Sequence, residues 1–209
     1  MGESWRHEIA GEPMILLADR ALYWPARERL LIADLHLGKG HVFRAAGVPV
    51  PTGGTHRDLA RLEGLLTMTG ARSLWILGDF LHGVRSPASD AAWLAFRHTH
   101  SSVAVGVVAG NHDRAFSAAD AGVEHLREGV VDGPFAFGHQ PQARGAHHWI
   151  CGHVHPVVRI PSTGRWPLFW LSAHLTVLPA FSAFTGGHAV PLAKARGSFA
   201  CNGQHLAPL

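Results

Sequence analysis

Cysteine and long apolar runs are scarce in this chain of 209 residues. Its two cysteines, Cys151 and Cys201, are too few for a disulfide framework or a zinc site built from thiolates. We therefore expect both to be reduced and structural. No apolar run approaches the ~18 residues of a membrane helix, and the opening MGESWRHEIAGEP lacks the form of a signal peptide. These absences predict a cytoplasmic protein with no membrane partner.

Charge is also sparse and shows no clustering. Charged residues make up 16% of the chain, the formal net charge is +3, and the basic residues are scattered. This balance permits an anionic partner without requiring one. The length and a hydrophobic fraction of 47% predict one soluble globular domain over residues 1–209 with a substantial core.

Histidine, in contrast, is abundant, with 17 copies. Histidine is the commonest metal ligand and the usual acid–base residue of enzymes. This abundance indicates a metal or catalytic site. Most of the histidines are nevertheless expected on the surface, among them His41, His98, His100, His147 and His148.

Alternating strand and helix patterns predict an α/β protein with mixed sheets. Short strands are expected at 14–18, 21–24 and 29–34, followed by a loop at 49–55. Leu59, Leu62 and Leu66 have the spacing of an amphipathic helix over 56–71. Ser86 and Pro87 are typical of a helix start, which predicts a second helix over 86–98. Further strands are expected at 73–79, 103–113, 135–139, 147–153, 156–160 and 167–172.

Five of these apolar strands end at residues that bind metals or transfer protons. In open α/β sheets, binding sites lie beyond the carboxyl ends of strands. Glycine directly precedes four of these clusters and permits a close approach of the backbone. On an extended strand, His153 and His155 point to the same face. The residues at the strand ends are Asp34, His36, Asp79, Asn111, His112, Asp113, His139, His153 and His155.

The ordered set DxH, GD, GNHD, GH and GHxH closely resembles the calcineurin-like metallophosphoesterase superfamily over residues 31–156. The resemblance implies two mixed β-sheets flanked by helices, an αββα sandwich. It also implies two divalent metals ~3.5–4 Å apart that activate a water and clamp a phosphoryl group. Transferred to this chain, the first metal takes Asp34, His36, Asp79 and His155. The second takes Asp79, Asn111, His139 and His153, so that Asp79 bridges the two.

The remaining residues of the pattern are His112 and Asp113. By the same resemblance, His112 stabilises the transition state or protonates the leaving oxygen. Asp113 is then expected to orient His112 by accepting from its other ring nitrogen. The alternative for Asp113 is a helix N-cap before RAFSAAD, and both roles could hold. The donor set suits Mn²⁺, Fe or Zn²⁺ and does not choose among them.

A finer resemblance covers residues 20–55, through ALYWP, DLHLGK and FRxxGxPVP. These motifs are similar to those of the bacterial ligase-associated DNA damage response endonucleases of the PdeM type. The resemblance implies a manganese-dependent DNA endonuclease that acts in DNA repair with a DNA ligase and a helicase. This chain departs from the pattern in its GHQP motif and in a short loop after Asp79. A short loop leaves the metals open, which suits a polymer such as single-stranded DNA.

Three residues near the first two motifs are candidates for substrate binding. Lys39 and Arg44, expected on a loop, could contact phosphates flanking the scissile bond, or they form a solvated basic surface. His82 follows Asp79 closely and is expected near the metals.

Two other functions are compatible with parts of the pattern. A small-molecule phosphatase or cyclic-nucleotide phosphodiesterase would use the same metals, but the sequence lacks a large insertion to enclose a small substrate. A non-catalytic scaffold is disfavoured because His112 and all seven ligand positions are present. The physiological metal, the oligomeric state and direct binding of repair partners are left open by the sequence.

Overall fold

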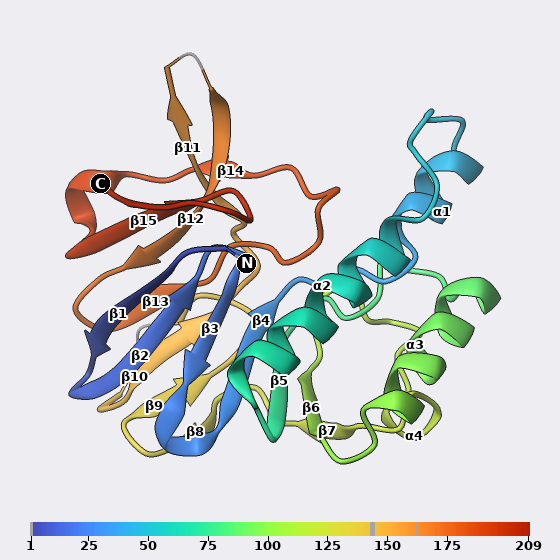
Figure 1. Ribbon diagram of the computed structural model, residues 1–209, viewed down its shortest axis with the longest axis horizontal. Coiled ribbons are helices and arrows are strands. Elements are labelled where there is room, and N and C mark those ends of the chain that lie inside the picture. The colour runs from blue at the N-terminus through green and yellow to red at the C-terminus, as the bar shows by residue number, and fades with distance from the viewer. Residues whose placement is uncertain (1, 143–144, 162) are drawn as a thin grey trace.

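The protein is built around two stacked mixed β-sheets, as the computed structural model shows for residues 2–142, 145–161 and 163–209 (Figure 1). The first sheet has seven strands in chain order. The first four strands are antiparallel to one another, and β4 to β7 are parallel. Its strands are β1 (Ser4–Ile9), β2 (Glu12–Leu17), β3 (Ala21–Trp24), β4 (Arg29–Ala33), β5 (Ser73–Leu77), β6 (Ala104–Val108) and β7 (Glu124–Leu126).

The second sheet contains nine strands, of which seven follow the order β14-β11-β12-β13-β10-β9-β8, while β15 pairs with β12 and β16 with β15. Strands β9, β10 and β13 at its centre are parallel. Its strands are β8 (Val130–Asp132), β9 (Phe135–Phe137), β10 (His148–Cys151), β11 (Pro156–Ile160), β12 (Gly164–Leu171), β13 (Leu175–Val177), β14 (His188–Ala189), β15 (Gly197–Cys201) and β16 (Leu206–Pro208).

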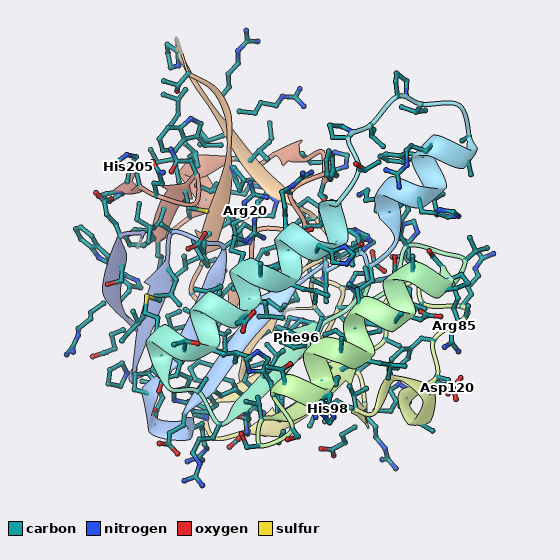
Figure 2. The ribbon with its side chains drawn as sticks, turned by 45° about the vertical axis from the view of Figure 1, so that its right-hand side comes forward. Arg20, Arg85, Phe96, His98, Asp120 and His205 are labelled. Carbon is teal, nitrogen blue, oxygen red and sulfur yellow. The ribbon has the colours of Figure 1, made fainter. Side chains whose placement is uncertain are left out.

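Two long helices, α2 (Gly54–Thr69) and α3 (Pro87–Thr99), lie side by side over one face of the first sheet (Figures 1 and 2). Phe96 is buried on the side of α3 that faces α2 (Figure 2). The shorter helices are α1 (Lys39–Ala45) and α4 (Ala118–Ala121), with 3-10 turns η1 (Pro25–Arg27) and η2 (Leu192–Lys194). Among the described residues, no helix is long and apolar enough to cross a membrane.

The central strands of the first sheet are buried on both faces, which explains their uninterrupted apolar sequences. In β4, Leu30 and Ile32 belong to the core between the sheet and the helices, whereas Leu31 and Ala33 belong to the core between the two sheets. Leu62 of α2 is fully buried in the first of these cores. Because both faces are packed, the carboxyl ends of these strands are held at fixed positions.

The mixed α/β class with two sheets and flanking helices is confirmed, and the expected long helices and central strands are present. The sequence missed β1 and α1, so the loop expected for Lys39 and Arg44 is wrong. The expected surface position of His148 is also wrong, because this side chain is buried, with Nε2 2.8 Å from Thr176 Oγ1. The two cysteines are free and buried, as predicted.

Candidate metal centre

The strand ends of both sheets bring four predicted ligands into one cluster. Asp34 and His36 follow β4, Asp79 follows β5, and His155 lies between β10 and β11. One ligand atom from each of these four residues lies within 4.8 Å of all the others. His36 Nε2 is 3.9 Å from Asp79 Oδ2, and His155 Nε2 is 3.4 Å from Asp34 Oδ1. This is the set that the resemblance assigned to the first metal.

The chemistry of the cluster fits a cation. Nε2 of His36 and Nε2 of His155 are buried and have no hydrogen-bond partner within the part of the chain that the structure describes. Buried polar atoms rarely lack a partner, so these two nitrogens favour an additional group between them and the carboxylates. Burial and the nearby Lys39 charge lower the pKa of His36 to about 2. The imidazole is therefore neutral, the form that binds metals. The buried cluster of Asp and His side chains could thus hold metal ions.

A second group of ligand atoms surrounds His139 at the end of β9. Its Nε2 lies 3.0 Å from Asn111 Oδ1, 3.0 Å from His153 Nδ1 and 3.6 Å from Asp79 Oδ1. Asp79 therefore has one carboxylate oxygen toward His139 and the other toward His36. All seven predicted ligands come together, and Asp79 occupies the position between the two groups that a bridging carboxylate needs.

Backbone strain is concentrated in the same loops. Five predicted ligands have φ between 44° and 68°: Asp34, His36, Asp79, His153 and His155. Non-glycine residues rarely adopt this left-handed region, and it persists only where the surrounding structure holds it. The sharp reversals turn the chain at the strand ends, and the side chains gather in one place.

Glycines next to the predicted ligands make room for other residues of the predicted ligand set. A Cβ at Gly78 would overlap the His139 ring, and a Cβ at Gly110 would overlap the backbone nitrogen and carboxylate of Asp79. The glycines of the GD and GNHD motifs are thus required by close packing of neighbouring loops. Gly78 also has φ +84°, which favours glycine on its own account.

Two carboxylates fasten the histidine loops through backbone amides. Asp34 accepts from the amide of His153 at 3.0 Å, and Glu128 accepts from the amide of His139 at 2.9 Å. Sequence reasoning missed Glu128, which lies in the β7–β8 connection outside every motif. Its role depends on a long-range contact for which the spacing of residues gives no signal.

Asp113 has a different place from the one expected. Its carboxylate accepts from the backbone amides of Phe80 (3.1 Å), Leu81 (2.7 Å) and Gly110 (2.7 Å). Both oxygens are thus engaged by backbone, and the expected hydrogen bond to the His112 ring is not found among the described contacts. The N-cap alternative is also wrong, because α4 begins at Ala118 with Ser117 as its cap. Asp113 joins the loop after Asp79 to the loop that carries Asn111.

We expect Asp113→Ala to lower the free energy of unfolding by about 3 kcal/mol or more, because three amides lose a charged acceptor. Urea unfolding of the purified variant measures this loss. Asp120→Ala is a suitable control, since the Asp120 side chain is 56% exposed in its ion pair with Arg85 and solvent-exposed ion pairs add little to stability. Equal losses in the two variants would contradict the role given to Asp113.

His82 and His112 lie beside the first ligand group. His82 Nδ1 is 3.3 Å from His36 Nδ1, and the His82 ring stacks on the His112 ring at a centroid distance of 4.9 Å. The amide of His112 donates to Asp79 Oδ1 at 2.9 Å. His112 is half-buried, so its ring lies next to the ligands and is partly open to solvent.

Lys39 and Arg44 take separate positions on α1. Lys39 is buried, and its Nζ donates to Thr185 Oγ1 at 3.3 Å. Burial lowers the pKa of Lys39, although Asp34 and Asp79 act in the opposite direction. A solvated surface is therefore excluded for Lys39. Arg44 is exposed and donates to Pro51 O at 3.2 Å.

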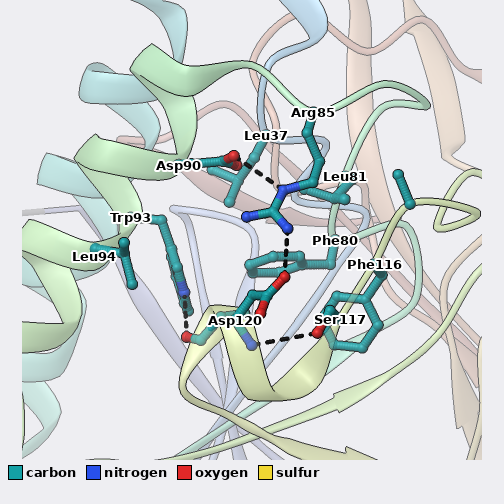
Figure 3. A pocket seen from close by; sticks show the side chains of 12 residues that line it. Leu37, Phe80, Leu81, Arg85, Asp90, Trp93, Leu94, Phe116, Ser117 and Asp120 are labelled. Atoms are coloured by element: carbon teal, nitrogen blue, oxygen red, sulfur yellow. Dashed lines mark hydrogen bonds and ion pairs between the residues drawn. The ribbon is translucent and has the colours of Figure 1, made fainter.

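An apolar cavity of about 20 Å³ lies behind the loop that follows Asp79 (Figure 3). Phe80 packs edge-on against Trp93, with ring centroids 4.9 Å apart, and also contacts Phe116. Arg85 spans the cavity by pairing with Asp90 at 3.0 Å and Asp120 at 2.6 Å (Figure 3). The side chains around this cavity anchor the loop of Asp79 to α3 and α4. The small volume of the cavity leaves little room for a ligand.

Comparison with solved structures places this arrangement in a family. The chain is 38% identical to the nuclease MPE of Pseudomonas putida, with 99% of this chain and 100% of the other covered and a TM-score of 0.89. The phosphoesterase Yfce of E. coli is 17% identical over 87% of this chain and 97% of its own, with a TM-score of 0.47. No family model and no curated protein matches the chain. From the first of these likenesses, the chain belongs to the metallophosphoesterase family that includes this nuclease, and it is a metal-dependent phosphoester hydrolase.

Proposed function

We propose that this protein is a manganese-dependent endonuclease that cuts single-stranded DNA during DNA repair. The observation that carries the proposal is the buried cluster of Asp34, His36, Asp79 and His155 in a chain that is 38% identical to a nuclease. Its location in the cytoplasm and its organisation as one domain over residues 1–209 stay predictions from the sequence.

The proposal assigns two metals to the seven ligand residues. One is held by Asp34, His36, Asp79 and His155, and the other by Asp79, Asn111, His139 and His153. Bound divalent cations would supply Lewis-acid stabilisation of the phosphoryl charge and lower the pKa of water. Manganese is favoured among Mn²⁺, Fe and Zn²⁺ by the resemblance to the ligase-associated endonucleases, since the donor set accommodates all three.

The chain's own side chains complete the reaction. His112 lies beside the ligands and partly open to solvent, where it can stabilise the transition state or donate a proton to the leaving oxygen. His82 orients the His112 ring through their stacking contact. Lys39 adds a positive charge near Asp34 and Asp79 that favours an anionic substrate, and Arg44 on the same helix can reach a more distant phosphate.

The preference for a single strand follows from access. The segment between Asp79 and the start of α3 at Pro87 is short, and the sequence contains no large insertion to close over a small substrate. The ligands lie at the ends of strands among loops, where a flexible strand enters more easily than a stiff duplex. Functional association with a DNA ligase and a helicase comes from the family resemblance in ALYWP and FRAAGVPVP.

The test is a cleavage assay with Mn²⁺ on circular single-stranded DNA, the matching duplex and a cyclic nucleotide. We expect the single-stranded circle to be converted to linear fragments about tenfold or more faster than the duplex, with weakening at high salt because phosphate contacts release counterions. Intact circular DNA together with rapid hydrolysis of the cyclic nucleotide would contradict the proposal and support the small-molecule phosphodiesterase.

A further inference from the structure

Another cavity, of about 140 Å³, lies where α1, α2 and α3 meet and includes several polar side chains in its wall. We call it the three-helix pocket and define it by Arg44 of α1, Thr55 and His56 at the start of α2, and Ser86 and Ser89 at the start of α3. In Figure 2 the beginnings of α2 and α3 lie at the end of the helical layer nearest α1. No carboxylate lines this pocket in the part of the chain that the structure describes.

The electrostatics of the pocket favour an anion. The first amides of an α-helix have no partner within the helix, and the helix dipole is positive at that end. Helix α2 has 16 residues, no acidic residue in its first turn, and Gly53 at its N-cap. Helix α3 has one acidic residue in its first turn, Asp90, which pairs with Arg85 on the side of the apolar cavity. Two helix starts and Arg44 therefore act on the pocket without a neutralising carboxylate.

The serines of the pocket give independent support. Ser86 and Ser89 are only 5% and 8% exposed, yet their hydroxyls have no hydrogen-bond partner among the described residues. Ser86 occupies the N-cap position of α3 without forming a cap bond, whereas Ser117 at the start of α4 accepts from the Asp120 amide. Both hydroxyl oxygens are reachable from the pocket and not fully enclosed, so they can donate to a ligand with hydrogen-bond acceptors.

The pocket adjoins the metal centre. A smaller cavity, of about 10 Å³, is lined by His36 and Lys39 and shares Gly40, Gly54 and Thr55 with the three-helix pocket. Thr55 accepts from the amide of Gly38 at 3.3 Å, which leaves its hydroxyl hydrogen available as a donor. A group in the three-helix pocket would thus be separated from the first ligand cluster only by this smaller cavity.

We propose that the three-helix pocket binds a backbone phosphate of the nucleic acid strand adjacent to the phosphate that is cut. The inference rests on the proposed nuclease function and adds a second anchoring point for the strand. The donors are the free amides of α2 and α3, the hydroxyls of Ser86 and Ser89, and the Arg44 guanidinium. These groups would contact the phosphate and not the bases, so the pocket would bind nucleic acid without preference for base sequence.

Ser89→Asp tests the proposal with Ser89→Asn as its matched control. Ser89 is the third residue of α3, where a carboxylate is favourable to the helix dipole, so the aspartate variant is expected to fold. The aspartate repels a phosphate, while asparagine has almost the same size as aspartate, no charge, and an amide N–H that can donate to the phosphate in place of the serine hydroxyl. We expect the Kd of Mn²⁺-loaded protein for single-stranded DNA and the KM for its cleavage to rise about tenfold or more in Ser89→Asp. Ser89→Asn should stay within about threefold of the wild type, and hydrolysis of bis-nitrophenyl phosphate, which is too small to reach the pocket, should be unchanged in both variants.

Substrates with one neutral methylphosphonate identify the occupant. One substrate carries this group on one side of the scissile linkage, and a second substrate carries it on the other side. We expect only one of the two substrates to bind the wild-type protein more weakly than unmodified DNA does. The same substitution should cause no further loss with Ser89→Asp, because the contact is already lost. Free inorganic phosphate could weaken the binding of single-stranded DNA while the methylphosphonate has no effect on either side. That result would overturn a backbone-phosphate site.

The outcomes separate this inference from the function on which it rests. If DNA is cut normally and the aspartate and asparagine variants behave alike, the pocket is refuted and the nuclease function stands. If DNA binds with the expected difference between the variants but is never cut, the nuclease function is refuted and the pocket stands. If the wild type neither binds nor cuts single-stranded DNA, both are refuted.

Discussion

Asp79→Asn is expected to remove both metals and to lower phosphodiester hydrolysis by about 10⁴-fold or more, because several kcal/mol of charge stabilisation are lost. The two oxygens of Asp79 face different ligand groups, Oδ2 toward His36 at 3.9 Å and Oδ1 toward His139 at 3.6 Å. Asparagine offers one neutral oxygen in place of two that share a charge. Its amide hydrogens would face one of the groups, so at least one site loses a ligand and both lose the negative charge.

Elemental analysis after loading with excess Mn²⁺ and gel filtration measures the metal content. Circular dichroism checks that the variant is folded. Asp90→Asn is a matched control, since Asp90 pairs with Arg85 beside the apolar cavity and away from the ligands. We expect the control to retain two metals per chain and wild-type activity. Retention of two metals by Asp79→Asn would show that this carboxylate does not bridge them.

The gathering of the strand-end residues was predictable because strand periodicity and chain order locate them without any long-range contact, whereas their assignment to two metals came from the family resemblance. Strands β4, β5 and β6 are buried on both faces, so their apolar runs end where the packed sheet ends. A polar residue at such an end, such as Asp34 or Asp79, has nowhere to lie but at the sheet edge shared by all the parallel strands. Spacing alone therefore brings the motifs together.

The supporting contacts were not predictable, since they join residues distant in sequence through backbone amides. Glu128 holds His139, and Asp113 holds the loops at Phe80 and Gly110. A carboxylate that accepts from an amide has no characteristic neighbours in sequence. The expected hydrogen bond between Asp113 and the His112 ring was wrong for this reason: the role that the resemblance gave to His112 called for a side-chain partner, whereas the fold turns the Asp113 carboxylate toward three amides.

Helix α1 illustrates a different limit of sequence reasoning. Its seven residues, KGHVFRA, include the weak helix former Gly40, and so short a helix has no apolar periodicity to detect. It contacts α2, and this tertiary packing supplies stability that a segment of this length lacks alone. The position of Arg44 over the three-helix pocket could be seen only once this helix was placed.

His112→Ala is expected to keep both metals and to lower turnover by about 10²–10⁴-fold, the range for one acid–base group. Metal binding should persist because His112 contacts Asp79 through its backbone amide, at 2.9 Å from Oδ1, and alanine retains that amide. Elemental analysis and kcat on a DNA substrate measure the two effects. His98→Ala, which removes an exposed imidazole on α3 (Figure 2), should change neither. Loss of metal in His112→Ala would assign His112 to the ligand set.

The leaving group distinguishes the two roles open to His112. A nitrophenolate leaves without protonation, whereas the alkoxide of a DNA sugar needs a proton in the transition state. If His112 is the general acid, His112→Ala should cost far more on DNA than on bis-nitrophenyl phosphate, in which the leaving oxygen needs little help. If His112 instead stabilises negative charge on the phosphoryl oxygens, the losses on the two substrates should be equal. Its half-buried ring, stacked on His82 at 4.9 Å between centroids, is partly open to solvent, as an acid that exchanges protons with water must be. We therefore expect the unequal result.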